Sequence, residues 1–243
     1  MQEIGTIKAI YRYPVKSMAG EPLTSAELGW HGIEGDRRYA FMRTESADAF
    51  PWLIASKMRE LVTYKAYYRK DDGASQPRVR VRTPAGEDFE LDSEPLLQQL
   101  SGAFGSSLKL ANLVNGIFDD APLSLISTET IKALEAETGR ALDIRRFRPN
   151  LLIEPCDGNP LRDDEWIGKT LLIGSAPNVS AVRVTIRDIR CVMVNIDPDT
   201  AAVDPLVFKT IVHNQNNCAG VYGSTFKPGT ISVGDRVCAI ENA

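Results

Sequence analysis

The sequence of 243 residues contains only four cysteines and two histidines. The cysteines are far apart and include no CxxC pair, which excludes a disulfide framework or a zinc-ribbon site. Two histidines are too few for a histidine-rich metal site. The HExxH, P-loop, GxGxxG and GxSxG motifs are all missing, and with them the signatures of zinc hydrolases, P-loop NTPases, Rossmann enzymes and α/β-hydrolases. Any chemistry must therefore come from other residues.

The sequence also lacks long hydrophobic runs and an excess of basic over acidic residues. No apolar run approaches the roughly 18–20 residues of a membrane span, and the N-terminus lacks the features of a signal peptide. Lysine and arginine total 28 against 32 acidic residues, so the net charge is −4. A general nucleic-acid binder needs a dominant basic surface instead. We therefore expect a cytoplasmic protein that binds neither nucleic acid nor membrane.

The first third of the chain has the pattern of short strands. Segments 4–13, 38–43, 61–69 and 79–83 are rich in β-branched and aromatic residues, and Gly, Pro, Asp and Ser separate them. Strands at such short spacing predict a small barrel or rolled sheet rather than βαβ units.

The rest of the chain predicts two helices and more strands. Apolar residues at helical spacing indicate helices over 94–104 and 128–138. Strand patterns return at 108–114, 150–154, 169–174, 181–186, 220–226 and 229–237. We expect a mainly β protein of the α+β class, divided into residues 1–115 and 116–243. A cleft between these two parts is the default place for a ligand.

Basic residues cluster beside loop-forming residues. Lys16 follows Tyr-Pro-Val, Arg37 follows Gly-Asp, and Arg148 precedes Pro-Asn. Arginine beside Gly, Pro or Asn suits a bidentate cradle for phosphate or carboxylate, although scattered solvated charge is the alternative for each motif. The Arg148 motif is the most suggestive, because a proline-fixed loop that leads into an apolar strand holds its polar groups rigidly.

Cys191 is the cysteine with the best case for a function. It follows Arg190, and a neighbouring arginine favours the thiolate, which attacks electrophiles or binds soft metals. A small buried core residue is the alternative. Cys238 lies in a strand pattern and Cys218 in a polar loop, where nothing nearby activates it.

Five motifs in order resemble one family. They are Tyr13-Pro-Val-Lys-Ser17, Gly35-Asp-Arg-Arg-Tyr39, Phe147-Arg-Pro-Asn150, Arg190-Cys191 with Ile196-Asp-Pro-Asp-Thr200, and Gly229-Thr-Ile-Ser-Val-Gly-Asp235. Together they are similar to the MOSC superfamily, in the class of the mitochondrial amidoxime-reducing component and its bacterial relatives. The resemblance implies a small N-terminal β-barrel-like domain packed on a MOSC β-barrel domain with a few short helices.

The resemblance also implies binding of the molybdenum cofactor, with Cys191 as the thiolate ligand of the metal. The positions that match those holding the pterin and its phosphate are Lys16, Ser17, Arg37, Arg148 and Asn150. Arg190 matches the residue beside the thiolate. Asp197 is a candidate for proton handling or substrate polarity, with an Asp-Pro turn residue as the alternative.

The implied activity is reduction of N-hydroxylated compounds, in which the N–O oxygen is removed at a cysteine-ligated molybdenum. The sequence has no C-x₄-C-x₂-C motif, so we expect no intrinsic iron–sulfur cluster and a separate flavin or ferredoxin-type electron donor. Two departures from the family pattern remove expected hydroxyl groups. Asp120-Ala121 stands where relatives carry hydroxyl residues, and Ile189 replaces a serine near Cys191.

Two other functions stay open. A carrier or storage protein would hold the molybdenum cofactor without turning over a substrate. A sulfur-transfer protein would carry a persulfide on Cys191, which is chemistry that a cysteine of low pKa can perform.

Overall fold

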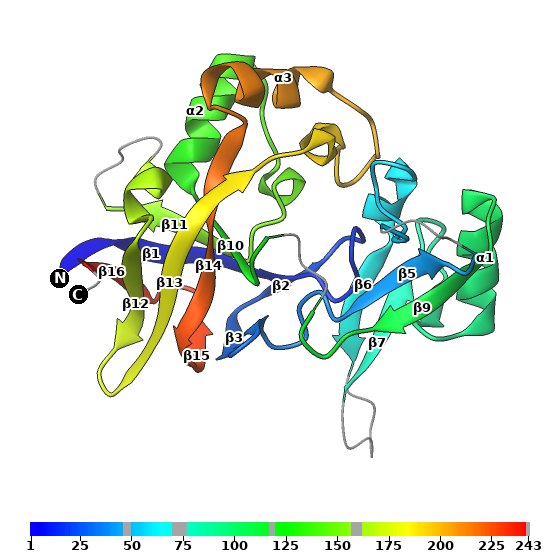
Figure 1. Cartoon of the computed structure of the whole chain (residues 1–243), viewed down its shortest axis with the longest axis horizontal. Coiled ribbons are helices and arrows are strands. Elements are labelled where there is room, and N and C mark those ends of the chain that lie inside the picture. Colours follow the sequence, from blue (N-terminus) through cyan, green and yellow to red (C-terminus); the bar gives the residue numbers. More distant parts are fainter. Residues whose placement is uncertain (46–49, 70–76, 117–119, 157–161, 242–243) are drawn as a thin grey trace.

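The computed structural model describes residues 1–45, 50–69, 77–116, 120–156 and 162–241. Its main feature is a closed β-barrel of seven strands in the order β11-β10-β14-β13-β12-β16-β1, which the pairing of β1 with β11 closes (Figure 1). Neighbouring strands are antiparallel, apart from the parallel pair β10 and β11. The barrel strands are β1 (Gln2–Arg12), β10 (Leu123–Ser127), β11 (Leu151–Pro155), β12 (Lys169–Ser175), β13 (Asn178–Ile189), β14 (Cys218–Lys227) and β16 (Arg236–Glu241). The predicted mainly β architecture is confirmed.

Alternating apolar residues fill the barrel. Leu171 and Ile173 on β12, and Val182 and Val184 on β13, are at most 1% exposed and belong to one core cluster. Because successive side chains of a strand point to opposite faces, this spacing of two turns one face of each strand inward. Trp166 packs against the same cluster from the 3₁₀ helix η3 (Arg162–Trp166).

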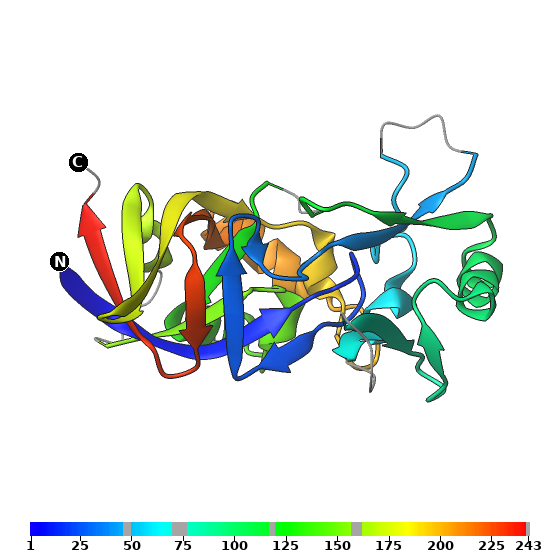
Figure 2. The ribbon, with the colours of Figure 1, turned by 90° about the horizontal axis from the view of Figure 1, so that it is seen from below.

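A smaller lobe lies beside the barrel and makes the molecule elongated (Figures 1 and 2). In it, β5 pairs with β9, and β6, β7 and β8 form a second antiparallel sheet. Its elements are β5 (Tyr39–Arg43), β6 (Lys65–Arg69), β7 (Arg78–Arg82), β8 (Asp88–Glu90), α1 (Glu94–Phe104) and β9 (Leu108–Asn112). Helix α1 occupies the predicted residues and buries Leu96 and Leu100 in the core of the lobe.

Two further helices cover the barrel. Helix α2 (Thr128–Thr138) begins after Ser127, whose hydroxyl accepts a hydrogen bond from the Thr130 N–H at 3.0 Å. It ends at Gly139, whose φ of 64° is the left-handed conformation that favours glycine. Helix α3 (Pro205–Asn214) packs against α2. No helix in the described ranges combines the length and the apolarity that crossing a bilayer requires.

The predicted strand over 61–69 is wrong in its first part, where the 3₁₀ helix η1 (Arg59–Thr63) precedes β6. Leu61 and Val62 are adjacent and both buried, whereas a strand turns adjacent side chains to opposite faces. The turn places Leu61 in the core of the small lobe and Val62 in a separate cluster.

Strands from the first part of the chain also pair with strands from the second. β1 pairs with β11 and β16 in the barrel, and the C-terminal end of β1 also pairs with β2 (Glu21–Leu23). A separate three-stranded sheet joins β15 (Gly229–Ser232) to β3 (Ser25–Gly29) and β4 (Gly32–Ile33). Pairing thus crosses the division that we predicted near residue 115, and that boundary stays a prediction.

Candidate functional site

Four loops meet where the small lobe joins the barrel. They follow β1, β4 and β13 and precede β11, and they contain four of the motifs that the sequence singles out. Their side chains, with residues of β10 and β14, line a pocket around Cys191 with a volume of about 80 Å³. We call it the Cys191 pocket. Its lining residues are Lys16, Ser17, Arg37, Ala121, Ser124, Arg146, Phe147, Arg148, Asp188, Ile189, Arg190, Cys191, Met193, Val194 and Tyr222.

Arg37 ties three of these loops together. Its Nη1 donates to Asp36 and, at 3.0 Å, to Oδ1 of Asn150, while its Nη2 donates to the carbonyl oxygen of Arg148 at 3.0 Å. Asp36 is 4% exposed and also accepts from the backbone N–H of Tyr13 at 2.7 Å. Fixed in this way, one guanidinium sets the spacing of loops that are more than a hundred residues apart in sequence.

Three of the predicted cofactor-binding residues have left-handed backbone conformations. The φ angle is 66° at Ser17, 48° at Arg37 and 50° at Arg148. For residues other than glycine this conformation costs about 1–3 kcal/mol, and such strain concentrates at functional sites. The loops of the Cys191 pocket are therefore held in a shape that local preferences alone would not select.

A buried ion pair forms part of the pocket wall. Arg190 is 7% exposed, and its Nη2 is 2.8 Å from Oδ2 of Asp188, which also accepts from the Ser124 hydroxyl at 2.8 Å. Nε of Arg190 donates to Ala219 and Nη1 to Phe147, both to carbonyl oxygens at 2.7 Å. Burial raises the pKa of Asp188 to about 6, against the opposing effects of Arg190 and Ser124.

Cys191 is exposed and stands directly before the 3₁₀ helix η4 (Val192–Asn195), at the wall of the pocket. Cys238 is buried, as its strand position predicts. Burial raises the pKa of the Cys218 thiol, which keeps it protonated. Among the described residues, no three His, Cys, Asp or Glu side chains gather into a metal site. Cys191 is the one thiol among the described residues of the lining and so the candidate soft ligand for a metal bound in this pocket.

The structure brings six predicted site residues to the pocket wall and leaves two outside it. The six are Lys16, Ser17, Arg37, Arg148, Arg190 and Cys191. Asn150 is fully buried behind them, where it accepts from the Ser124 N–H at 3.1 Å and donates to the Tyr11 carbonyl at 3.2 Å. Its contacts are those of a residue that positions Arg37.

Asp197 has the contacts of a turn residue. Its Oδ1 accepts from the backbone N–H and the hydroxyl of Thr200 at 3.0 and 2.9 Å, and its Oδ2 accepts from Arg146 at 2.8 Å. Burial raises the pKa of this carboxyl, but the bonds from Thr200 and the charge of Arg146 outweigh it and hold the pKa below its ordinary value. A catalytic role for Asp197 stays a prediction.

Arg146 and Tyr222 also line the pocket, although neither is among the site residues that we predicted. Arg146 lies at the end of the 3₁₀ helix η2 (Ile144–Arg146), and its Nη1 donates to the Asn195 carbonyl at 2.9 Å. The cluster of arginines over 145–148 was a signal that the site included this residue. Tyr222 had no such signal, because only the pairing of β14 with β10 brings it opposite Ser124.

The two departures from the family pattern differ in how they meet the pocket. Ala121 and Ile189 both line the pocket, and neither offers a polar side chain to a ligand. Asp120 is exposed and is not among the lining residues.

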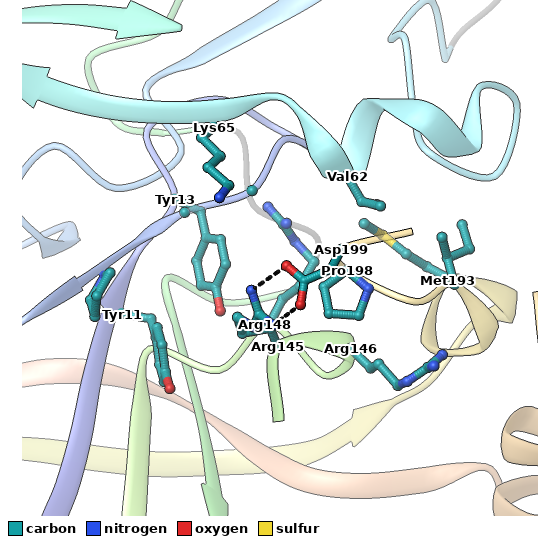
Figure 3. Close-up of a pocket in the computed structure, with 14 residues that line it drawn as sticks. Tyr11, Tyr13, Val62, Lys65, Arg145, Arg146, Arg148, Met193, Pro198 and Asp199 are labelled. Carbon is teal, nitrogen blue, oxygen red and sulfur yellow. Dashed lines mark hydrogen bonds and ion pairs between the residues drawn. The ribbon is translucent and has the colours of Figure 1, made fainter. Parts of the chain in front are cut away.

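A larger pocket of about 330 Å³ adjoins the Cys191 pocket and shares Arg146, Arg148 and Met193 with it. We call it the seam pocket. Figure 3 shows Tyr13 and Lys65 on one side of it and Val62 and Met193 on the other. Its remaining lining residues are Tyr11, Ala19, Gly20, Pro22, Arg145, Ile196, Pro198 and Asp199.

The fold and the loops around Cys191 define the class of the protein. Residues 104–238 match the MOSC domain, and residues 4–113 match the MOSC N-terminal beta barrel domain. The chain belongs to the MOSC family.

Among similar proteins is human mitochondrial amidoxime-reducing component 1, which is 25% identical over 98% of this chain and 83% of its own length. Bovine mitochondrial amidoxime reducing component 2 is 29% identical over 98% of this chain and 84% of its own. The crystal structure of the YuaD protein from Bacillus subtilis superposes with a TM-score of 0.55 at 13% identity, covering 100% of this chain and 99% of that chain. This last likeness concerns the fold alone.

Proposed function

We propose that this protein binds the molybdenum cofactor in the Cys191 pocket and reduces N-hydroxylated compounds there, with electrons from a separate flavin or ferredoxin-type protein. The observation that carries the proposal is the position of Cys191. An exposed thiol stands in the wall of a pocket that Lys16, Arg37 and Arg148 also line. The similarity to amidoxime-reducing components supports the substrate class.

The residues present fit the cofactor. A thiolate is a soft ligand that suits molybdenum, and arginine side chains bind phosphate in bidentate geometry. The pocket of about 80 Å³ is small beside the roughly 300–1,000 Å³ of most small-molecule sites. A pterin cofactor would therefore be only partly enclosed by this pocket.

The cofactor would supply the two-electron redox chemistry. In the balanced reaction the N–O bond of R–NH–OH breaks, two electrons come from the donor protein and two protons from water, and R–NH₂ and water form. Cys191 would hold the metal. The bonds of Arg190 to Ala219 and Phe147 fix the residue before Cys191 and so orient the thiol. Arg37 and Arg148 would hold the phosphate of the cofactor.

The first experiment measures molybdenum and oxidised pterin in the purified protein, in the parent and in Cys191→Ala. We expect roughly stoichiometric amounts in the parent and a loss of molybdenum in the variant. Cys218→Ala is the matched control, because Cys218 is not among the residues that line the pocket. Equal losses in the two variants would contradict the role of Cys191.

The second experiment adds amidoximes and hydroxylamines to the cofactor-loaded protein with an artificial reductant. We expect formation of the amidine or amine. Loaded protein that gives no product, but passes its cofactor to an apo-enzyme, would be a carrier. Protein without molybdenum, whose Cys191 gains one sulfur atom from a sulfur donor, would be a sulfur-transfer protein.

A further inference from the structure

A buried polar atom at the seam pocket has no hydrogen-bond partner among the described residues. It is the hydroxyl oxygen of Tyr13, a residue that is 2% exposed. The guanidinium groups of Arg37 and Arg148 both lie over its ring, 5.1 and 4.2 Å from the ring centroid. Burial raises the pKa of this phenol, so the hydroxyl stays protonated and is available as a donor. A buried donor without an acceptor costs free energy, which an oxygen atom of a ligand would recover.

The same side of the pocket carries a lysine whose charge is not balanced locally. Lys65 is exposed on β6, and no carboxylate within the described ranges forms an ion pair with its ammonium group. Arg82 stands opposite Lys65 in the pairing of β6 with β7. The arginines at the other side of the pocket are already paired, since Arg145 binds Asp199 and Arg146 binds Asp197. The uncompensated positive charge thus lies on the side of Tyr13 and Lys65.

The facing wall is apolar and firmly supported. Val62 and Ile196 are each 6% exposed and pack in one cluster with Ala55 and Ala201, and Met193 packs against it. A wall of this kind removes the apolar body of a ligand from water, at roughly 25 cal/mol for each Å² that it covers.

From these three features we propose that the seam pocket binds a small monoanion with an apolar body, of which an aromatic carboxylate is the simplest case. The lining supplies one buried hydroxyl donor and one ammonium group to the oxygens of such a ligand. Lys65 is one cation without an ion-pair partner among the described residues, and one such charge matches a monoanion better than a dianion such as a phosphate monoester. The volume of about 330 Å³ is at the lower end of the range usual for small-molecule pockets. This site requires neither the molybdenum cofactor nor the reductase activity.

The test compares two probes of the same shape, naphthalene-2-carboxylate and its uncharged carboxamide. Each is titrated into the full chain labelled with ¹³C at the methionine methyl groups. The signal of Met193, assigned with Met193→Leu, reports on the pocket, while the methyl groups of Met42 and Met58 are references outside its lining. We expect a saturable shift at Met193 and binding of the carboxylate about threefold to fivefold tighter than that of the carboxamide.

Two variants separate charge from hydrogen bonding. Lys65→Gln should weaken the carboxylate about threefold to fivefold, to the level of the carboxamide, and leave the carboxamide unchanged. Tyr13→Phe should weaken both probes about threefold to tenfold, because each loses a hydrogen bond from the hydroxyl. Lys57→Gln, an exposed lysine of the same lobe that is not in the lining, is the control and should change neither affinity.

Three results would overturn the proposal: no shift at Met193, equal affinity for the two probes, or binding that is indifferent to both Lys65→Gln and Tyr13→Phe. The titration is repeated with cofactor-loaded protein, where we expect the carboxylate still to bind. Competition between the probe and the cofactor would assign this space to the cofactor and would also overturn the proposal. Because binding is measured without turnover, failure of the reductase assay does not affect this result.

Discussion

Nη2 of Arg37 donates a hydrogen bond to the carbonyl oxygen of Arg148 at 3.0 Å, and the backbone of both residues is left-handed, with φ angles of 48° and 50°. Each guanidinium also lies over the ring of Tyr13. Two loops that are far apart in sequence thus fix each other around one aromatic ring. This contact holds the cationic wall of the Cys191 pocket in place before any ligand arrives, which lowers the entropic cost of binding.

We predict that Arg148→Ala lowers retention of the molybdenum cofactor about tenfold to a hundredfold, since it removes a charge-assisted contact of about 1.5–3 kcal/mol. The measurement is molybdenum and pterin content after dialysis. Arg183→Ala is the matched control, because Arg183 also lies over an aromatic ring, that of Phe226 at 4.6 Å, but outside the lining of the pocket. Equal retention by the two variants would place the phosphate-binding residues elsewhere.

Asn150 gives a prediction about stability. Its side chain accepts from the Ser124 N–H and from Arg37 and donates to the Tyr11 carbonyl. Asn150→Ala leaves these groups without partners, so the free energy of unfolding should fall by about 2–3 kcal/mol in urea titrations of cofactor-free protein. Lys16→Gln changes the pocket wall itself and should lower cofactor retention with a smaller change in stability. Unchanged stability of Asn150→Ala would contradict the positioning role and favour direct contact with a ligand.

Local patterns were sufficient to predict most of the secondary structure. The helix over 94–104 follows from apolar spacing alone, and Gly139 ends the second helix as its residue type predicts. The pattern failed at 61–63, because β-branched and aromatic content does not distinguish a strand from a buried 3₁₀ turn. The membership of β1 in the barrel depends on pairing with β11 and β16, which a local pattern cannot contain.

The candidate site was predictable to the extent that its residues occur in motifs. Arg37, Arg148 and Cys191 stand in such motifs and line one pocket. The seam pocket was not predictable, because Lys65 comes from β6 and Met193 from the 3₁₀ helix η4, and only tertiary packing brings them together.

Replacement of Asp197 distinguishes a catalytic role of this residue from a structural one. As a turn residue it accepts bonds from Thr200 and Arg146 as a carboxylate, so Asp197→Asn should lower the free energy of unfolding by about 1–2 kcal/mol at pH 7. Because the folded pKa is depressed, this contribution is present above the ordinary pKa of 3.8 and is lost as pH falls through the folded value. The difference between parent and variant should therefore shrink in acid. A variant of unchanged stability whose pH–activity profile loses one limb would show catalysis instead.

For Asp188 we predict that the contribution to the free energy of unfolding depends on pH in the opposite direction. Burial raises its folded pKa from 3.8 to about 6, so the folded protein binds this proton more tightly than the unfolded chain does. The stabilisation is fully present below about pH 4 and is lost as pH rises through about 6. Relative to Asp188→Asn, the parent should therefore lose roughly 2–3 kcal/mol of unfolding free energy between pH 4 and pH 7.

Urea titrations of the cofactor-free protein at several pH values measure this difference. Asp92→Asn, at an exposed position, controls for the change in net charge. If the parent and Asp188→Asn give parallel curves over this range, the ion pair with Arg190 at 2.8 Å stabilises the carboxylate enough to cancel the cost of its burial. Asp188 would then be charged throughout, and the guanidinium beside Cys191 would be neutralised at every pH at which the protein is folded.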